Sequence, residues 1–291
     1  MSLAFLEYEE QFGRLWDRLV GGRASLPRFP EAAVALEAER RRLAVLFRGL
    51  GGDPGLELVA SSETASNHRL RVLQRLGMGE ERLARAERTS QLVLLPPVLD
   101  CLPSASLNRD LYVWLVAYLA GAECPAAEPD PLRRDLLRLR HAARRTAAVL
   151  HDFPGLRSRH AALASALLAL RPVRRLPPVE SGIEAVVRQL HGGEPATGPL
   201  AALVAAPAAD PGVLAAPRRY RPFLPSPLWG EVRDEAEAEA AARQEAERGS
   251  GEASDADRRH RRARRRRLDN TERSDPSPMP SSQPRKRCTR A

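Results

Sequence analysis

The side chains best suited to acid–base chemistry are His151, Asp152 and His191. Both histidines stand at the ends of predicted helices, where a histidine commonly interacts with the helix dipole, so each also has a structural interpretation. The six histidines are scattered rather than clustered as metal ligands, and the sequence has no metalloprotease, nucleophile-elbow or phosphate-loop motif. We therefore predict no catalytic residue, no metal site and no cofactor, and expect that the protein is not an enzyme.

The most visible charged motif is the run 258–267, which holds eight arginines and no acidic residue. It follows the acidic stretch 231–257, with ten acidic residues and three arginines. Arginine runs bind phosphates, so a nucleic-acid-binding protein is one alternative. No aromatic side chain is interleaved for base stacking, however, and the acidic stretch can neutralise the run. We favour a solvated, charged segment and regard nucleic acid as a poor partner.

Composition bounds the fold and the compartment. The chain is 43% hydrophobic but only 4% aromatic, so its core is built from Leu, Val and Ala, which favours helices. Three scattered cysteines fit a reducing compartment rather than a disulfide framework. No signal-peptide pattern and no long apolar run is present. We expect a cytoplasmic protein with no membrane insertion.

Apolar residues recur every three or four positions through the first two thirds of the chain, which is typical of amphipathic helices. Asp130 before Pro131 predicts a capped helix start, and 91–99 is read as an extended connector. No strand alternation of useful length is found. The sequence predicts an all-α fold, an antiparallel helical array. The predicted helices cover residues 5–19, 30–50, 70–76, 107–120, 131–150, 156–170 and 183–190.

Three regions follow from these patterns. Residues 1–193 form the helical domain, 194–230 a Pro/Ala-rich linker and clamp, and 231–291 a charged, largely disordered tail. The predicted helix 131–150 has an arginine-rich face, which is either a solvated face or a surface for an acidic partner. Trp229 lies in the proline-rich stretch, where it serves either as an intramolecular clamp or as a partner contact.

Four stretches together resemble one family, the nitric oxide reductase activation protein NorD and its relative CbbO. No single stretch is decisive, but they occur in the family's order across about residues 30–276. They are Leu46–Pro54, Leu107–Leu115, Arg219–Phe223 with Pro227–Glu231, and the acidic stretch followed by the arginine run and 268–276.

The resemblance implies a non-catalytic adaptor that works with a MoxR-class AAA+ ATPase. Its client is nitric oxide reductase, or rubisco in the CbbO branch. The family's C-terminal von Willebrand factor A domain is not found in this sequence, so we expect a truncated form, and an inert fragment is a further alternative. The residues that the family motifs assign to partner binding are Asn108, Arg109, Asp110, Trp114, Tyr220, Arg221 and Trp229. For Asp110 and Trp114 a structural role, in the first helical turn and in the core, is the competing interpretation.

Overall fold

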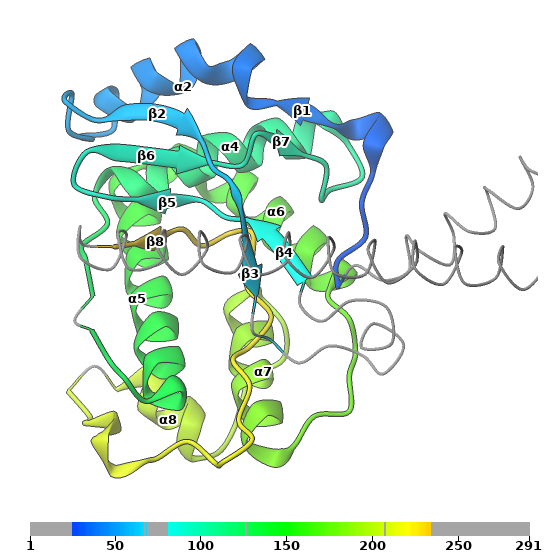
Figure 1. Cartoon of the computed structure of the whole chain (residues 1–291), viewed down its shortest axis with the longest axis vertical. Helices are drawn as coiled ribbons and strands as arrows, with labels where there is room; N and C mark the ends of the chain where they lie inside the picture. The colour runs from blue at the N-terminus through cyan, green and yellow to red at the C-terminus, as the bar shows by residue number, and fades with distance from the viewer. Residues whose placement is uncertain (1–24, 67, 69–80, 126, 207, 234–291) are drawn as a thin grey trace, which may run out of the picture. The chain divides into compact units, whose positions relative to one another are not determined.

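The computed structural model describes residues 25–66, 68, 81–125, 127–206 and 208–233 (Figure 1). The chain divides into two units, Met1–Ala238 and Glu239–Ala291, and every described residue belongs to the first. The helices predicted over 5–19 and 70–76 lie outside the described residues. So do the arginine run and the rest of the charged tail beyond 233, and the nucleic-acid alternative therefore stays a prediction.

The prediction of an all-α fold is wrong, because the described residues form a mixed α/β structure. One sheet has four strands in the order β2-β6-β5-β8, and two further sheets have two strands each. β6 is parallel to β2 and antiparallel to β5, while β8 is parallel to β5. The strands are β1 (Val34–Ala35), β2 (Glu57–Ala60), β3 (Glu63–Ser66), β4 (Glu81–Ala84), β5 (Glu87–Arg88), β6 (Leu92–Leu95), β7 (Val98–Leu99) and β8 (Glu231–Val232).

The strands escaped detection because each has only two to four residues, too few for alternation to stand out. The segment 91–99, predicted to be a connector, contains the central strand β6 and the strand β7. Val93 and Leu95 of β6 are fully buried and alternate with half-buried Leu92 and Leu94. Pairing with β2 and β5 on its two sides makes this stretch part of the core.

Most helices lie close to where the apolar periodicity places them. Asp130 accepts hydrogen bonds from the backbone N–H groups of Leu132 and Arg133, which confirms the predicted cap. Two starts were wrong. The helix predicted from Pro30 begins at Leu36, because the preceding residues pair with β7, and the helix predicted over 183–190 already begins at Pro178. The α-helices are α2 (Leu36–Gly49), α4 (Ala105–Ala120), α5 (Pro131–Asp152), α6 (Arg157–Leu170), α7 (Pro178–Leu190) and α8 (Pro199–Ala205), with short 3-10 turns η1 (Pro30–Ala32), η2 (Pro154–Leu156) and η3 (Pro211–Val213).

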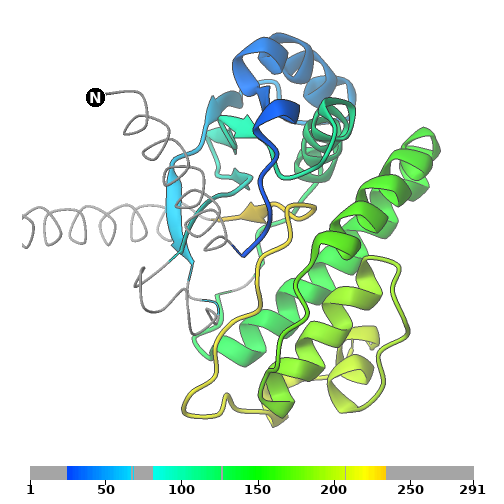
Figure 2. The same cartoon turned by 90° about the vertical axis from the view of Figure 1, so that its right-hand side faces the viewer.

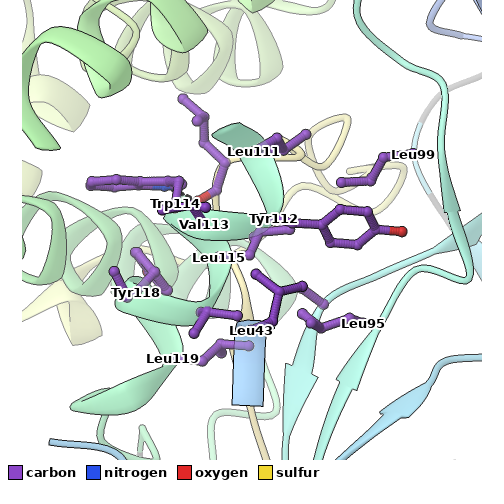
Figure 3. Packing of buried hydrophobic residues seen from close by; sticks show 14 of the residues in the cluster. Leu43, Leu95, Leu99, Leu111, Tyr112, Val113, Trp114, Leu115, Tyr118 and Leu119 are labelled. Atoms are coloured by element: carbon purple, nitrogen blue, oxygen red, sulfur yellow. Dashed lines mark hydrogen bonds between the residues drawn. The ribbon is translucent and has the colours of Figure 1, made fainter. Parts of the chain in front are cut away.

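Helix α4 is the centre of the larger core. Every residue from Leu111 to Ala120 is buried, because α2, the strands and α6 surround the helix. Figure 3 shows Leu43 from α2 and Leu95 from β6 lying close to Leu115 and Leu119 of α4. A helix that is apolar all round needs such complete cover, which the sheet supplies on one side.

A second core lies between α5, α7 and α8, and in Figure 2 these helices run together away from the strands. Residues after α8 follow this core and then turn to the sheet, where they end as β8 (the yellow course in Figure 1). Tyr220, Leu224 and Leu228 are buried along that course. The stretch 214–233 is called the strap below, because it contacts both cores.

Candidate partner-binding site

Asn108 sits in the first turns of α4 and is fully buried. Its side-chain amide donates to the carbonyl of Ala32 at 2.8 Å and to that of Leu102 at 3.0 Å. Its carbonyl oxygen accepts from the Leu102 backbone N–H at 3.2 Å. These bonds satisfy the amide and tie the start of α4 to η1, so the structure gives Asn108 a positioning role inside the fold.

Arg109 and Asp110, the next two residues, reach the surface. Arg109 is 53% exposed and its Nε lies 3.2 Å from a Glu39 carboxylate oxygen on α2. Asp110 is 32% exposed and lies 3.4 Å from Arg159 Nε on α6. Ion pairs this exposed contribute little to stability. Both side chains are therefore available to a partner at low energetic cost.

Trp114 is 1% exposed and belongs to the core, as the structural interpretation predicts. Its indole N–H donates to the carbonyl of Leu228 in the strap at 2.9 Å, and its ring lies 4.3 Å from that of His160. A buried indole N–H needs such an acceptor. Trp114 thereby holds the strap against α4 and cannot touch a partner directly.

Tyr220 anchors the other end of the strap. Its hydroxyl donates to Asp135 on α5 at 2.6 Å, and the same carboxylate oxygen accepts from the Phe223 N–H at 3.1 Å. Burial outweighs these bonds and raises the pKa of Asp135 to about 6, and burial beside this carboxylate also raises the pKa of Tyr220. Arg221 is exposed, and only its backbone N–H is fixed, by Glu180 at 3.2 Å.

Trp229 is half-buried and makes an intramolecular contact, one of the two interpretations left open by the sequence. Its ring lies 5.0 Å from that of His191 and 6.3 Å from that of Phe223. His191 is the C-cap of α7 and pairs with the Val187 carbonyl at 2.7 Å and the Ser226 hydroxyl at 2.8 Å. Burial lowers its pKa to about 4, so His191 is neutral at pH 7 and is not a charged partner of the helix dipole.

The other acid–base candidates are poorly placed for catalysis. His151 and Asp152 lie 3.0 Å apart, but the histidine is 88% exposed at the end of α5. Across the described ranges, no group of three or more His, Cys, Asp and Glu side chains is arranged to hold a metal ion. In the same part of the chain, no helix is long and apolar enough to cross a membrane.

The arginine face of α5 mostly binds backbone carbonyls of the chain itself. Arg140 donates to the carbonyls of Leu203 and Ala209, at 2.7 and 2.6 Å. Arg145 donates to the carbonyls of Tyr118 and Ala117 at the end of α4, at 2.7 and 2.9 Å. A guanidinium fork satisfies helix-end and loop carbonyls that would otherwise lack donors. Arg140 and Arg145 are therefore engaged within the fold, whereas Arg144 is 69% exposed and pairs with the exposed Glu123.

One ionic cluster was missed by the sequence analysis. Glu231 on β8 accepts from Arg85 at 3.0 Å, Arg138 at 3.3 Å and Arg233 at 3.0 Å, and Arg233 also pairs with Glu87 at 3.0 Å. Burial would raise the Glu231 pKa, but the three guanidiniums outweigh it and lower the pKa to about 2. Up to 146 positions separate these partners, so no local spacing signals the cluster.

A buried polar chain continues from this cluster. Arg85 also donates to the Ser66 hydroxyl at 3.0 Å, and His68 lies 2.8 Å from both the Ser66 and the Ser25 hydroxyls. The histidine is 4% exposed and both serines are also buried. These hydrogen bonds join Ser66 of β3, through Arg85, to Glu231 of β8.

The structure therefore divides the seven predicted residues into two kinds. The first kind positions the strap and α4 and comprises Asn108, Trp114, Tyr220 and Trp229. Arg109, Asp110 and Arg221 present charge at the surface, the first two on α4 and the third on the strap.

Comparison with known proteins identifies a class of relatives. The chain is 42% identical to Protein NorD of Brucella abortus (strain 2308) over 229 residues, which is 78% of this chain and 35% of the relative. It is 36% identical to Protein NorD of Stutzerimonas stutzeri over 189 residues, 63% of this chain and 28% of the relative. An uncharacterised Pseudomonas aeruginosa protein is 33% identical over 226 residues, 77% and 32% of the two chains.

These matches support the NorD family for the part of the chain that they cover. The chain spans about a third of the length of the curated relatives it matches. No family model matches the sequence, and no solved structure matches it.

Proposed function

We propose that this chain is a non-catalytic adaptor of the NorD type, which takes part in the activation of nitric oxide reductase together with a MoxR-class AAA+ ATPase. The observation that carries the proposal is the 42% identity to a NorD protein over 229 residues. Because the ATPase partner consumes ATP, the adaptor acts in the cytoplasm. ATP and any metal belong to the partners.

The geometry supports a binding role rather than a chemical one. His191 and Asp135, two titratable groups whose pKa values are shifted by burial, are buried and bonded within the fold. Arg109 and Asp110 instead stand at the surface of a helix whose next turns are locked in the core. A rigid helix that presents opposite charges is suited to orient a partner.

The relatives favour the reductase as the client over rubisco, because those with an assigned name are NorD proteins. A deletion strain that lacks its own NorD protein tests this choice. Expression of the full chain in that strain is expected to raise nitric oxide reductase activity. Equal activity with and without the chain would count against the proposed client.

The ATPase contact is tested by a pull-down of the full chain with a purified MoxR-class ATPase in the presence of ATP. Arg109→Ala combined with Asp110→Ala is expected to reduce capture by about tenfold, the size of losing two interface ion pairs. The matched control is Glu37→Ala with Arg40→Ala, which removes an exposed ion pair on α2 whose charged atoms lie 3.1 Å apart. Like the Arg109/Asp110 variant, it leaves the net charge of the chain unchanged. Equal capture of both double variants would refute the role of Arg109 and Asp110, and no capture of the full chain would refute the partner.

A further inference from the structure

A second charged surface lies on the strap and on the loop between α6 and α7. Arg174 and Arg221 line one pocket, and Arg175, Arg218 and Arg219 are their neighbours along the chain. These five residues are called the arginine surface. The side chains of Arg175, Arg218 and Arg221 are exposed and have no hydrogen-bond or ion-pair partner within the described part of the chain.

The pocket has an apolar floor made by Ile183, Phe223 and Leu224. The carboxylates beside it are already engaged, since Glu184 pairs with Arg171 at 2.7 Å and Glu180 accepts from the Arg221 N–H at 3.2 Å. The guanidiniums of Arg171 and Arg188 neutralise the charge of Glu184, and the five arginines of the surface outnumber the one remaining carboxylate, that of Glu180. An apolar floor with a rim of arginines favours a ligand that combines carboxylates with an apolar side chain.

The pocket is poorly suited to nucleic acid. Tyr220 is buried with its hydroxyl bonded to Asp135, and the Phe223 ring packs edge-on to Trp229. Among the described lining residues, only the half-buried Phe223 ring thus reaches the pocket, and a single ring is a poor platform for successive bases. Guanidinium forks match the geometry of carboxylates equally well, and a peptide supplies both the carboxylates and the apolar group.

We infer that the arginine surface binds an acidic peptide segment of a partner protein, with one apolar side chain of that segment seated on the Ile183–Phe223 floor. This inference goes beyond the proposed function and does not depend on whether the partner is the ATPase or the reductase.

The experiment uses the full chain and a fluorescein-labelled peptide of sequence EEALEEALEE, with binding measured by fluorescence anisotropy at moderate salt. Arg218→Ser combined with Arg221→Ser is expected to weaken binding about tenfold, the loss expected for two ion pairs. The matched control is Arg41→Ser with Arg48→Ser on α2, which are also exposed and remove the same net charge. The control is expected to change the affinity by less than about twofold.

A second probe replaces both leucines of the peptide by serine and is expected to bind several-fold more weakly. Equal losses in the two double variants, an unchanged affinity of the serine probe, or no binding to the full chain would each overturn the inference. If a single-stranded oligonucleotide bound the full chain and lost the same affinity in the Arg218/Arg221 variant, the surface would be a phosphate-binding site. That result would overturn the inference. Self-association abolished by that variant would assign it to a second copy of the chain. If the serine variant fails to fold, Arg218→Lys with Arg221→Lys serves instead, with a smaller loss expected because the forked contact is removed.

Discussion

Replacing Glu231 by glutamine tests whether the ionic cluster at β8 holds the strap in place. The carboxylate accepts from three guanidiniums, those of Arg85, Arg138 and Arg233. A pKa lowered from 4.5 to about 2 corresponds to about 3 kcal/mol of stabilisation at pH 7. The Glu231 side chain is 19% exposed, so solvent screening reduces this stabilisation to about 2–3 kcal/mol. Glutamine keeps the size and an acceptor oxygen but removes the charge.

The pH dependence of the loss gives the sharper measurement. Because the folded pKa of Glu231 is depressed, its contribution is complete above about pH 4.5 and is lost as the pH falls towards 2. Urea unfolding of Glu231→Gln is therefore expected to show the full deficit in unfolding free energy at pH 7. The difference from the wild-type chain should shrink steadily below pH 4.5.

A matched control separates burial from charge removal. Glu123→Gln removes one charge from an ion pair with Arg144 whose side chains are 78% and 69% exposed, and it is expected to cost less than about 0.5 kcal/mol. A deficit for Glu231→Gln no larger than that of the control would refute the reasoning. So would a deficit that stays constant between pH 7 and pH 3.

Three further substitutions test the interior by urea unfolding. Asn108→Ala leaves two backbone carbonyls and one N–H buried without their bonds, and is expected to cost about 3 kcal/mol or more. Asp135→Asn keeps an acceptor for Tyr220 but cannot ionise. Because burial raises the Asp135 pKa from 3.8 to about 6, wild-type stability falls between about pH 4 and pH 6 and is level above, and the variant is expected to gain about 2–3 kcal/mol relative to it across that window. Gly230→Ala places a Cβ 2.5 Å from a Leu119 methyl carbon and is expected to cost about 1–3 kcal/mol.

For each of these three substitutions, a different unfolding result would contradict the prediction. An Asn108→Ala chain within about 1 kcal/mol of wild type would mean that the amide bonds are dispensable. A pH-independent difference for Asp135→Asn would contradict the raised pKa of the carboxyl. Gly155→Ala is the control for Gly230→Ala, because nothing lies within 4 Å of a Cβ at position 155.

Local signals in the sequence were sufficient for most of the helices. Apolar periodicity and the Asp130–Pro131 start predicted α5, and the stripe from Leu107 predicted α4 to within two residues at its start. These features act within one or two helical turns, so they are visible in the sequence without a partner. The same stretch carried the resemblance to NorD that the relatives support.

The strands depended on tertiary structure. β6 has four residues, and its burial on both sides comes from β2 and β5, which pair with it from other parts of the chain. β8 has two residues and becomes a strand only because the strap brings it beside β5, about 140 positions earlier in the chain. Short strands carry almost no local preference, so long-range pairing decides them.

The sequence alone determined most of the described helical segments, the Asp130 cap and the family motifs, because these depend on neighbours three or four residues apart, whereas α8 lies in the stretch predicted to be a linker. Only the tertiary structure decided which motif residues are buried: Asn108 and Trp114 face the interior, whereas Arg109, one position from Asn108, faces solvent. It also brought Glu231 to Arg85 and Tyr220 to Asp135. Contacts between residues 85 or more positions apart arise from packing of whole elements, and no local pattern encodes them.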